Sequence, residues 1–439
     1  MNHHRDNVSE LAVRALDIMP GGVSHDGRQL EPYGLFVGSA QGARKTGADG
    51  RVYIDFACGN GSIILGHGYK PSIEAGAEAM ARGFHFSAGS EAELRWAEAV
   101  RALMPAAQQV RFTSSGNEAC LLALAVSRAV SGNAAVLTLA GHYHGWAAPA
   151  VLPTVPLDGF AARGDQVTLV EAPDAAQAVA ALTSGRFGAV ILEPTGASFG
   201  KLPLGRHEVQ ALVAAARAAG TICIFDETIT GFRVAPGGAQ ELFGVAPDLI
   251  VLGKILGGGL PCGALAGRRE LLSVLDNRTN GARARVSHMG TGNGNPVVAA
   301  VGATTLLALA DGDAVGRAAA AGARLRDGLN RAFAQTGVPW AAYGQSSGFH
   351  LFLNPAGRRI DPAAFDATKI PAAELGARNG QLTNDLRIAL LAAGIDINPW
   401  PGGLLSAAHD AAVIDEAVAG FSDAIEAMSR HTAMSGWAG

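Results

Sequence analysis

The stretch Asp248–Gly259 reads D-L-I-V-L-G-K-I-L-G-G-G, and it decides the fold class. The apolar run Leu249–Leu252 predicts a strand buried on both faces, which is typical of a parallel sheet covered by helices. Lys254 follows the strand, among glycines that let a bulky planar group approach the backbone. Burial lowers the pKa of an ammonium, so a neutral amine becomes available to condense with an aldehyde. The alternative is a lysine that reaches solvent at the sheet edge.

Length and composition indicate a globular protein with a large core. The chain has 439 residues, of which 49% are hydrophobic and 16% charged, enough for two domains. A net charge of -4 without a basic run argues against nucleic acid or an anionic membrane as partner. The N-terminus MNHHRDNVSE lacks the apolar core of a signal peptide. The apolar run Val297–Ala310 is too short to span a bilayer and predicts a core helix.

The cysteines and the one H-x-H pair give no metal or disulfide signature. The four cysteines are Cys58, Cys120, Cys223 and Cys262, and no two form a CxxC pair. We expect small buried thiols in a reducing cytoplasm. His142 and His144 lack further ligands nearby in the sequence, so we expect no metal site.

Short apolar runs alternate with helical patterns through the middle of the chain. The expected strands are Val110–Ser114, Ala135–Ala140, Val167–Glu171, Ala189–Glu193, Thr221–Asp226, Leu249–Leu252 and Gly263–Gly267. Helical patterns such as Glu118–Val130 and His207–Ala219 separate several of them, which implies right-handed crossovers and a mainly parallel sheet. The predicted fold is α/β, with about seven strands in the large domain.

Three regions are expected: an N-terminal segment (1–70) that packs with a small α/β domain (307–439), and a large domain (71–306) between them. Within the small domain, Ala314–Gln335 predicts a long helix. Strands are expected at Ser347–Leu353, Ile395–Asn398 and Leu404–Ala407. Arg358–Asn379 shows no clear periodicity and predicts a surface loop.

Ligands of open α/β sheets bind outside the carboxyl ends of the strands, where this chain places polar residues. Ser115-Gly116-Asn117 open a helix and suit a phosphate, although Ser114 or Ser115 with Glu118 also makes an ordinary helix cap. Tyr143 follows the second strand and either stacks on a flat ligand or belongs to the core. Asp226 and Glu193 each end an apolar strand, where a desolvated carboxylate needs a cationic ring nitrogen, an arginine or a helix N-terminus.

Pyridoxal 5′-phosphate needs all of these features together. Lys254 suits its aldehyde and Asp226 its ring nitrogen, which must stay protonated for the ring to withdraw electrons. The features follow one another in strand order, so the sequence predicts an enzyme that uses this cofactor.

Two segments then resemble the class III PLP-dependent aminotransferases, in the branch similar to glutamate-1-semialdehyde 2,1-aminomutase. They are F-D-E-T-I-T-G-F-R (Phe225–Arg233) and P-D-L-I-V-L-G-K-I-L-G-G-G-L-P (Pro247–Pro261). Further matching motifs are Pro20-Gly21-Gly22-Val23, Tyr53-Ile54-Asp55-Phe56, Leu65-Gly66-His67, Arg111–Ala119, Tyr143-His144-Gly145, Glu193-Pro194, Gly290-Thr291 and Gly294-Asn295-Pro296. The resemblance implies fold type I of the PLP enzymes and a homodimer with active sites at the subunit interface.

The resemblance also implies roles for single residues. Lys254 is the lysine that holds the cofactor aldehyde and shuttles protons, and Asp226 holds the pyridine nitrogen. The phosphate is held by Ser115, Gly116 and Asn117, with Thr291 reaching it from the neighbouring subunit. Further cofactor contacts are Tyr143, His144, Glu193 and Thr228. Thr228 stands where the family usually has valine, so its hydroxyl needs a partner.

Two departures from the aminomutase pattern favour transamination. Trp146–Asp165 is shorter than the gating loop of the aminomutases, and Pro401-Gly402-Gly403 stands where they have a glutamate. An aminomutase must enclose its intermediate, whereas an aminotransferase releases a keto product. We therefore expect a ping-pong transfer from an amine or amino acid to a keto acid, aldehyde or ketone. The alternatives are a mutase or racemase, and a binding protein without catalysis, which the intact Lys254 and Asp226 disfavour.

Arg28 falls where some relatives place an arginine that binds a substrate carboxylate. A guanidinium binds a carboxylate through two hydrogen bonds, but a surface or structural arginine is the alternative. His25 and Trp400 are further candidates for lining the substrate pocket.

Overall fold

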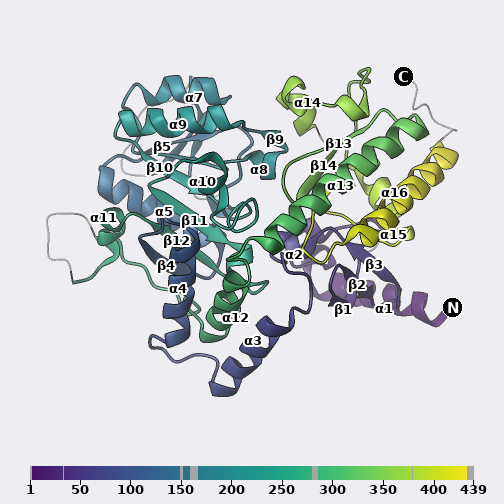
Figure 1. Ribbon diagram of the computed structural model, residues 1–439, viewed down its shortest axis with the longest axis horizontal. Helices are drawn as coiled ribbons and strands as arrows, with labels where there is room; N and C mark the ends of the chain where they lie inside the picture. Colours follow the sequence, from purple (N-terminus) through teal and green to yellow (C-terminus); the bar gives the residue numbers. More distant parts are fainter. Residues whose placement is uncertain are drawn as a thin grey trace. The chain divides into compact units, whose positions relative to one another are not determined.

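The computed structural model describes residues 2–32, 34–148, 152–158, 167–278, 285–377 and 379–432, without the side chains of 2–9 and 430–432. The chain forms two compact units (Figure 1). The first joins residues 1–69 to residues 316–439, and the second is the continuous segment 70–315. The expected division into domains 1–70, 71–306 and 307–439 stays a prediction.

An eight-stranded sheet forms the centre of the second unit, in the order β4-β12-β11-β10-β8-β5-β7-β6. The strands are β4 (Gln109–Thr113), β5 (Ala135–Leu139), β6 (Thr154–Pro156), β7 (Thr168–Ala172), β8 (Ala189–Leu192), β10 (Ile222–Asp226), β11 (Leu249–Gly253) and β12 (Gly263–Gly267). β12 is antiparallel to both neighbours, and the other pairs are parallel. The expected strands are all present and the α/β fold class is confirmed. The expected count of seven is corrected to eight, because β6 is short, partly exposed and contains a proline.

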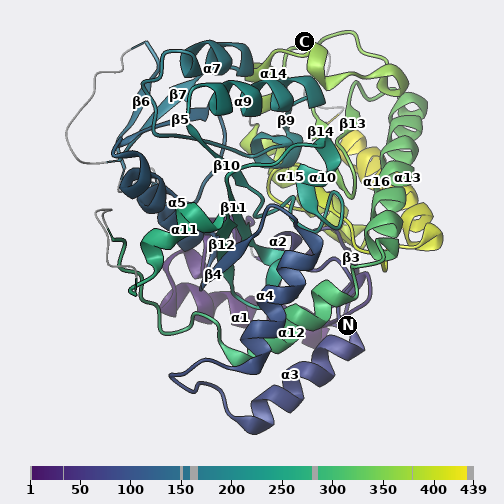
Figure 2. The same cartoon turned by 60° about the vertical axis from the view of Figure 1, so that its left-hand side comes forward.

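Helices cover both faces of this sheet. α5 (Gly116–Ser131) packs on β4, β8 and β10–β12, while α7 (Ala175–Leu182) and α9 (Arg206–Ala218) lie side by side on the opposite face (Figures 1 and 2). Because both faces are covered, every residue of β10, β11 and β12 is buried. The remaining α-helices described in this unit are α3 (Lys70–Arg82), α4 (Glu91–Leu103), α8 (Ala197–Gly200), α10 (Gly238–Phe243), α11 (Arg269–Leu272) and α12 (Pro296–Leu307).

α12 is the expected core helix. Asn295 caps it by accepting hydrogen bonds from the amides of Val297 and Val298 at 3.0 and 3.3 Å. The helix packs against α3 and α4 and buries residues around most of its circumference. Among the described residues, no helix is long and apolar enough to cross a membrane.

The first unit contains two small sheets, β1-β2-β3-β15 and β13-β14-β16. The strands are β1 (Val37–Gln41), β2 (Arg44–Gly47), β3 (Val52–Asp55), β13 (Ala341–Tyr343), β14 (Gly348–Phe352), β15 (Ile395–Asp396) and β16 (Gly402–Leu404). Its α-helices are α1 (Asn2–Ile18), α2 (Cys58–Gly61), α13 (Asp313–Thr336, whose first residues belong to the second unit), α14 (Ala372–Gly376), α15 (Gly380–Ala392) and α16 (Ala411–Thr432). β15 pairs in parallel with β3, so the two chain segments share one sheet.

Two sequence expectations for this unit need correction. The last strand is β16, slightly earlier than the expected Leu404–Ala407, since the pairing with β14 begins at Gly402 and ends at Leu404. The expected loop Arg358–Asn379 contains three short helical segments, η5 (Pro362–Ala364), η6 (Ala367–Lys369) and α14. Aspartates cap the first two, and residue 378 lies outside the described residues.

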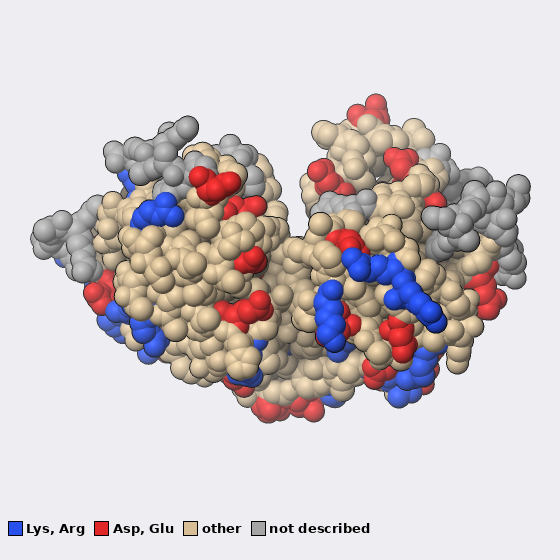
Figure 3. Space-filling view, turned by 90° about the horizontal axis from the view of Figure 1, so that it is seen from above, with Lys and Arg blue, Asp and Glu red and all other residues tan. Residues whose placement is uncertain are grey.

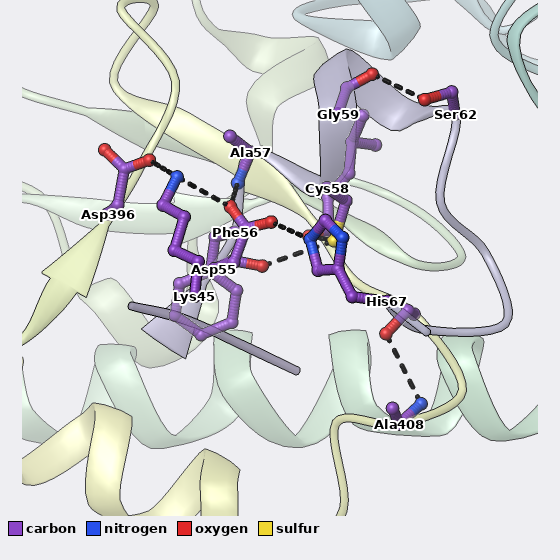
Figure 4. A network of polar contacts seen from close by, with 12 residues as sticks. Lys45, Asp55, Phe56, Ala57, Cys58, Gly59, Ser62, His67, Asp396 and Ala408 are labelled. Carbon is purple, nitrogen blue, oxygen red and sulfur yellow. Dashed lines mark hydrogen bonds and ion pairs between the residues drawn. The ribbon is translucent and has the colours of Figure 1, made fainter. Parts of the chain in front are cut away.

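A buried polar network connects the two chain segments of the first unit (Figure 4). Lys45 on β2 contacts Asp55 at 3.2 Å and also Asp396 on β15. The other oxygen of Asp55 lies 2.7 Å from Nε2 of His67. Burial acts to raise the pKa of Asp55, but His67 and Lys45 outweigh it and hold the pKa well below its usual range. The network therefore depends on an ionised Asp55.

The surface carries both signs of charge. On the face shown in Figure 3, Lys and Arg side chains lie next to Asp and Glu side chains among largely uncharged residues. This mixture agrees with the low net charge of the chain.

Candidate functional site

Lys254 lies directly after β11, as the first residue of the short helix η3 (Lys254–Gly257). Its backbone is in the left-handed region, with φ of 51°, which is uncommon for a residue with a side chain. Burial lowers the pKa of its amine to about 8, although the nearby carboxylates of Asp226 and Glu193 act in the opposite direction. A neutral amine is therefore accessible near neutral pH.

Asp226 ends β10, the strand next to β11, and its buried carboxylate accepts four hydrogen bonds. Oδ2 accepts from Nδ1 of His144 at 2.9 Å and from the thiol of Cys120 at 3.3 Å. Oδ1 accepts from the hydroxyl and the amide of Thr228 at 2.6 and 3.1 Å. Burial acts to raise the pKa of Asp226, but the hydrogen bonds from His144 and Thr228 outweigh it and lower the pKa. The Thr228 hydroxyl thus has the partner that its position requires.

A second buried carboxylate, Glu193, shapes the segment that follows β5. Oε1 of Glu193 accepts hydrogen bonds from the amides of Tyr143 at 2.8 Å and Ser198 at 3.1 Å. Burial raises the pKa of Glu193 to about 7. Nδ1 of His142 accepts from the amide of Glu193 at 2.9 Å, and burial lowers the pKa of His142 to about 3. His142 therefore stays neutral and fixes the backbone of Glu193, while the Tyr143 ring is mostly exposed.

The turn before α5 has the form expected of both a helix cap and a phosphate site. The Ser115 hydroxyl accepts from the amide of Glu118 at 3.2 Å, so Ser115 is the N-cap. The amides of the first helical turn, including those of Gly116 and Asn117, have no partner within the helix. Oδ1 of Asn117 accepts from the amide of Ala147 at 3.2 Å, which fastens the Tyr143 segment to α5.

A Cβ at any of three glycines around this turn would crowd a neighbouring side chain. A Cβ at Gly116 would lie 2.9 Å from Cγ2 of Thr228, and one at Gly253 would lie 3.2 Å from the same methyl group. A Cβ at Gly145 would lie 2.1 Å from Oδ1 of Asn117. These glycines bring the turn, Thr228 and the start of η3 together.

The remaining predicted residues lie elsewhere. Thr291 is exposed in the second unit, where its carbonyl oxygen lies 2.5 Å from Nε2 of His85. Arg28, His25 and Trp400 all belong to the first unit. A Cβ built at Gly27 would lie 3.2 Å from the His25 ring and 3.8 Å from Pro399, so the Arg28 turn lies beside the segment of Trp400.

Sequence reasoning missed two residues of this site, His142 and Cys120. His142 showed only as half of an H-x-H pair, and Cys120 only as one of four cysteines outside any CxxC pair. Ligand atoms of Cys120, His144 and Asp226 lie within 4.8 Å of one another, but they already hydrogen-bond among themselves. The expectation of no metal stays a prediction.

Comparison with known proteins places the chain in one family. The family described as "Aminotransferase class-III" matches residues 26–339. A glutamate-1-semialdehyde 2,1-aminomutase of Methanothermobacter thermautotrophicus is 36% identical over 356 residues, which are 78% of this chain and 83% of the relative.

Solved structures are similar over almost the whole chain. An omega-transaminase from Sphaerobacter thermophilus is 29% identical with a TM-score of 0.84, covering 97% of this chain and 99% of that one. A β-phenylalanine aminotransferase from Variovorax paradoxus is 29% identical with a TM-score of 0.83, covering 99% and 96%. The fold, the residues at the strand ends and these similarities agree: the chain belongs to the class III aminotransferase family.

Proposed function

We propose that this protein is an aminotransferase that moves an amino group from an amine or amino acid to a keto acid, aldehyde or ketone. One observation carries the proposal. A buried ionised carboxylate, on Asp226, ends β10, and an amine of lowered pKa, on Lys254, directly follows the neighbouring parallel strand β11. An aldehyde-bearing cofactor with a basic ring nitrogen needs these two groups.

The cofactor is pyridoxal 5′-phosphate, and the residues fit it. Ser115, Gly116 and Asn117 would hold the phosphate at the start of α5, where a side chain at Gly116 would collide with Thr228. Tyr143, His144, Glu193 and Thr228 would surround the ring. When bound, the cofactor supplies an aldehyde that accepts the donor's amino group and a ring that withdraws electrons from the substrate's α-carbon.

The chain's own contribution is proton transfer and charge. Nζ of Lys254 is the base that takes a proton from the substrate and returns it, because its pKa of about 8 leaves both forms populated near neutral pH. Hydrogen bonds from His144 and Thr228 keep Asp226 ionised, and its charge would keep the ring nitrogen of a bound cofactor protonated. His144 orients Asp226, and Glu193 fixes the backbone of Tyr143.

Glutamate-1-semialdehyde aminomutase activity is the alternative, and the relative from M. thermautotrophicus supports it. Transamination has support from the two solved relatives. It also has support from β16, where the glutamate of the aminomutases would not fit. A Cβ at Gly402 would lie 2.4 Å from the Phe349 carbonyl oxygen, and one at Gly403 would lie 2.7 Å from Cβ of Phe56. A glutamate at either position has no room. The other departure, Trp146–Asp165, lies partly outside the described residues.

We further propose a homodimer with Thr291 at its interface. Phe84, Phe86 and Met289 are 67%, 46% and 92% exposed. The Asn295 side chain donates to the Phe84 carbonyl at 2.8 Å, and His85 contacts the Thr291 carbonyl, so these apolar side chains belong to one surface around Thr291. A second copy of the chain would cover it. All four cysteines are buried thiols, which suits the proposed cytoplasmic location.

Product analysis separates the two activities. The protein, loaded with pyridoxal 5′-phosphate, is incubated with a panel of amines and α- and β-amino acids, with and without pyruvate or 2-oxoglutarate. A keto product that accumulates only with an acceptor supports transamination. Conversion of glutamate-1-semialdehyde to 5-aminolevulinate without an acceptor, and no transfer from any donor, would establish the mutase instead.

A further inference from the structure

The carboxylate of Asp226 has no acceptor position left for another donor. A carboxylate offers about four lone-pair sites. In this structure the donors are Nδ1 of His144, the thiol of Cys120, and the amide and hydroxyl of Thr228. A protonated ring nitrogen that binds Asp226 must therefore displace one of these donors or share an oxygen with it.

Of the donors whose hydrogen bond to Asp226 can be displaced by a rotation, the Thr228 hydroxyl is the strongest. Its hydroxyl lies 2.6 Å from Oδ1 of Asp226, the shortest of the four contacts. The Thr228 amide is fixed by the backbone, whereas the proton of a hydroxyl rotates about the Cβ–Oγ1 bond without moving a heavy atom. The Cys120 thiol also rotates, but it is a weak donor at 3.3 Å.

The packing of Thr228 determines where its hydroxyl points. Cγ2 of Thr228 lies close to both glycines of the turn: a Cβ built at Gly116 would be 2.9 Å from it, and a Cβ built at Gly253 would be 3.2 Å from it. Oγ1 of Thr228 lies 3.0 Å from the Cβ built at Gly116, so the methyl group and the hydroxyl both lie beside this glycine, and the hydroxyl donates to Asp226. A valine would fill the same space but donate no hydrogen bond.

We propose that the Thr228 hydroxyl competes with the cofactor's ring nitrogen for Asp226, so that Thr228 acts as a positioning residue that weakens the hold on that nitrogen. The inference rests on the proposed function and concerns one contact of the same site. Its consequence is a cofactor whose ring nitrogen loses its proton more readily than it would beside valine, because less of the Asp226 charge is available to it.

The test compares two ligands that lack the aldehyde, so that Lys254 forms no bond with either. They are pyridoxine 5′-phosphate and its 1-deaza counterpart, in which a C–H group replaces the ring nitrogen. The ratio of their dissociation constants isolates the contact between the ring nitrogen and Asp226. A general packing defect at Thr228 changes both constants and leaves the ratio unchanged.

Thr228→Val is expected to shift the ratio about ten-fold in favour of pyridoxine 5′-phosphate, the size typical of one charge-assisted hydrogen bond. Thr228→Ser keeps the hydroxyl and should leave the ratio within about two-fold of wild type. The absorbance of the bound ring should also show its nitrogen protonated to higher pH in Thr228→Val than in wild type.

Cys120→Ala is the matched control, because it removes a weak donor from the same carboxylate. A shift as large as that of Thr228→Val would show that any lost donor suffices and would overturn the assignment to Thr228. An unchanged or reversed ratio in Thr228→Val would overturn the competition itself. If wild-type protein bound neither ligand, the proposed function would fail together with this inference.

Discussion

Asp226 lies opposite Val251 in the parallel pairing of β10 with β11, and Lys254 follows Val251 by three residues. The register therefore brings a buried carboxylate and a buried amine to one edge of the sheet. A shift of one residue would turn the Asp226 side chain to the opposite face and separate the pair.

Replacing Lys254 with alanine should abolish turnover and preserve the fold. The change removes the only group assigned to proton transfer, so the initial rate of keto product formation should fall by about a thousand-fold or more. Lys70→Ala, at an exposed lysine on α3, is the matched control and should keep the wild-type rate. Wild-type turnover in Lys254→Ala, with an unchanged circular dichroism spectrum, would contradict the mechanism.

The capture of pyridoxal 5′-phosphate by the cofactor-free protein should accelerate as pH rises through about 8. The pKa of Lys254 is lowered to about 8, and only the neutral amine present above that pKa attacks an aldehyde. Stopped-flow absorbance measured across the pH range gives the midpoint. A midpoint near 10.5, the ordinary value for lysine, would mean that Lys254 is not desolvated.

Gly116→Ala should weaken the binding of pyridoxal 5′-phosphate. The added methyl group would lie 2.9 Å from Cγ2 of Thr228 and push the turn away from Thr228. We expect an increase of about ten-fold or more in the dissociation constant, measured by fluorescence titration. Gly89→Ala is the control, since a Cβ there meets no atom within 4 Å. Equal affinities in the two variants would remove the turn from the site.

Arg28→Gln should raise KM for donors that carry a carboxylate and spare simple amines. The side chain is exposed on η2 (Asp26–Arg28), beside the segment of Trp400, and its guanidinium suits a carboxylate. We expect about a ten-fold increase in KM for a β-amino acid and almost none for an arylalkylamine. Arg51→Gln, at another exposed arginine of the same unit, should change neither. Equal effects on both donor classes would make Arg28 structural.

Asp55→Asn should destabilise the first unit by about 3 kcal/mol at neutral pH, the typical cost of removing one partner of a buried ion pair. The pKa of Asp55 is depressed in the folded protein, so its contribution is complete above its unfolded pKa of about 4 and is lost as pH falls further. Urea unfolding should therefore show a difference between wild type and variant that shrinks below about pH 4. A difference independent of pH would mean that the charge of Asp55 is not what stabilises the network.

The sequence predicted seven of the eight strands in the large sheet, because most of these seven are buried on both faces. Uniform apolar runs such as Leu249–Leu252 have few alternative structures, and the polar residues after them mark the strand ends. β1 (Val37–Gln41) was not predicted, because most of its residues are exposed and its sequence V-G-S-A-Q has no apolar pattern. Such a strand forms through pairing with β2, which a hydrophobic pattern does not reveal.

Side-chain partners distant in sequence were the other omission. Asp226 was expected to need a cationic ring nitrogen, an arginine or a helix N-terminus, but its contacts with His144 and Cys120 span 82 and 106 residues. His142 belongs to an H-x-H pair for which no metal was expected, and its hydrogen bond from the Glu193 backbone was not foreseen. The histidine contacts result from β10, β8 and β5 being adjacent in the sheet, and the Cys120 contact results from α5 packing on β10. Single-sequence patterns specify neither arrangement.

β3 needs β15 as its neighbour, and 246 residues (70–315) separate the two chain segments of their unit. During synthesis, β3 leaves the ribosome long before its partner strand has been translated. The continuous segment 70–315 has no such delay and can fold as it emerges. Until translation is nearly complete, the apolar side chains of β3 have no core to enter, which makes this stretch a place for chaperones to act.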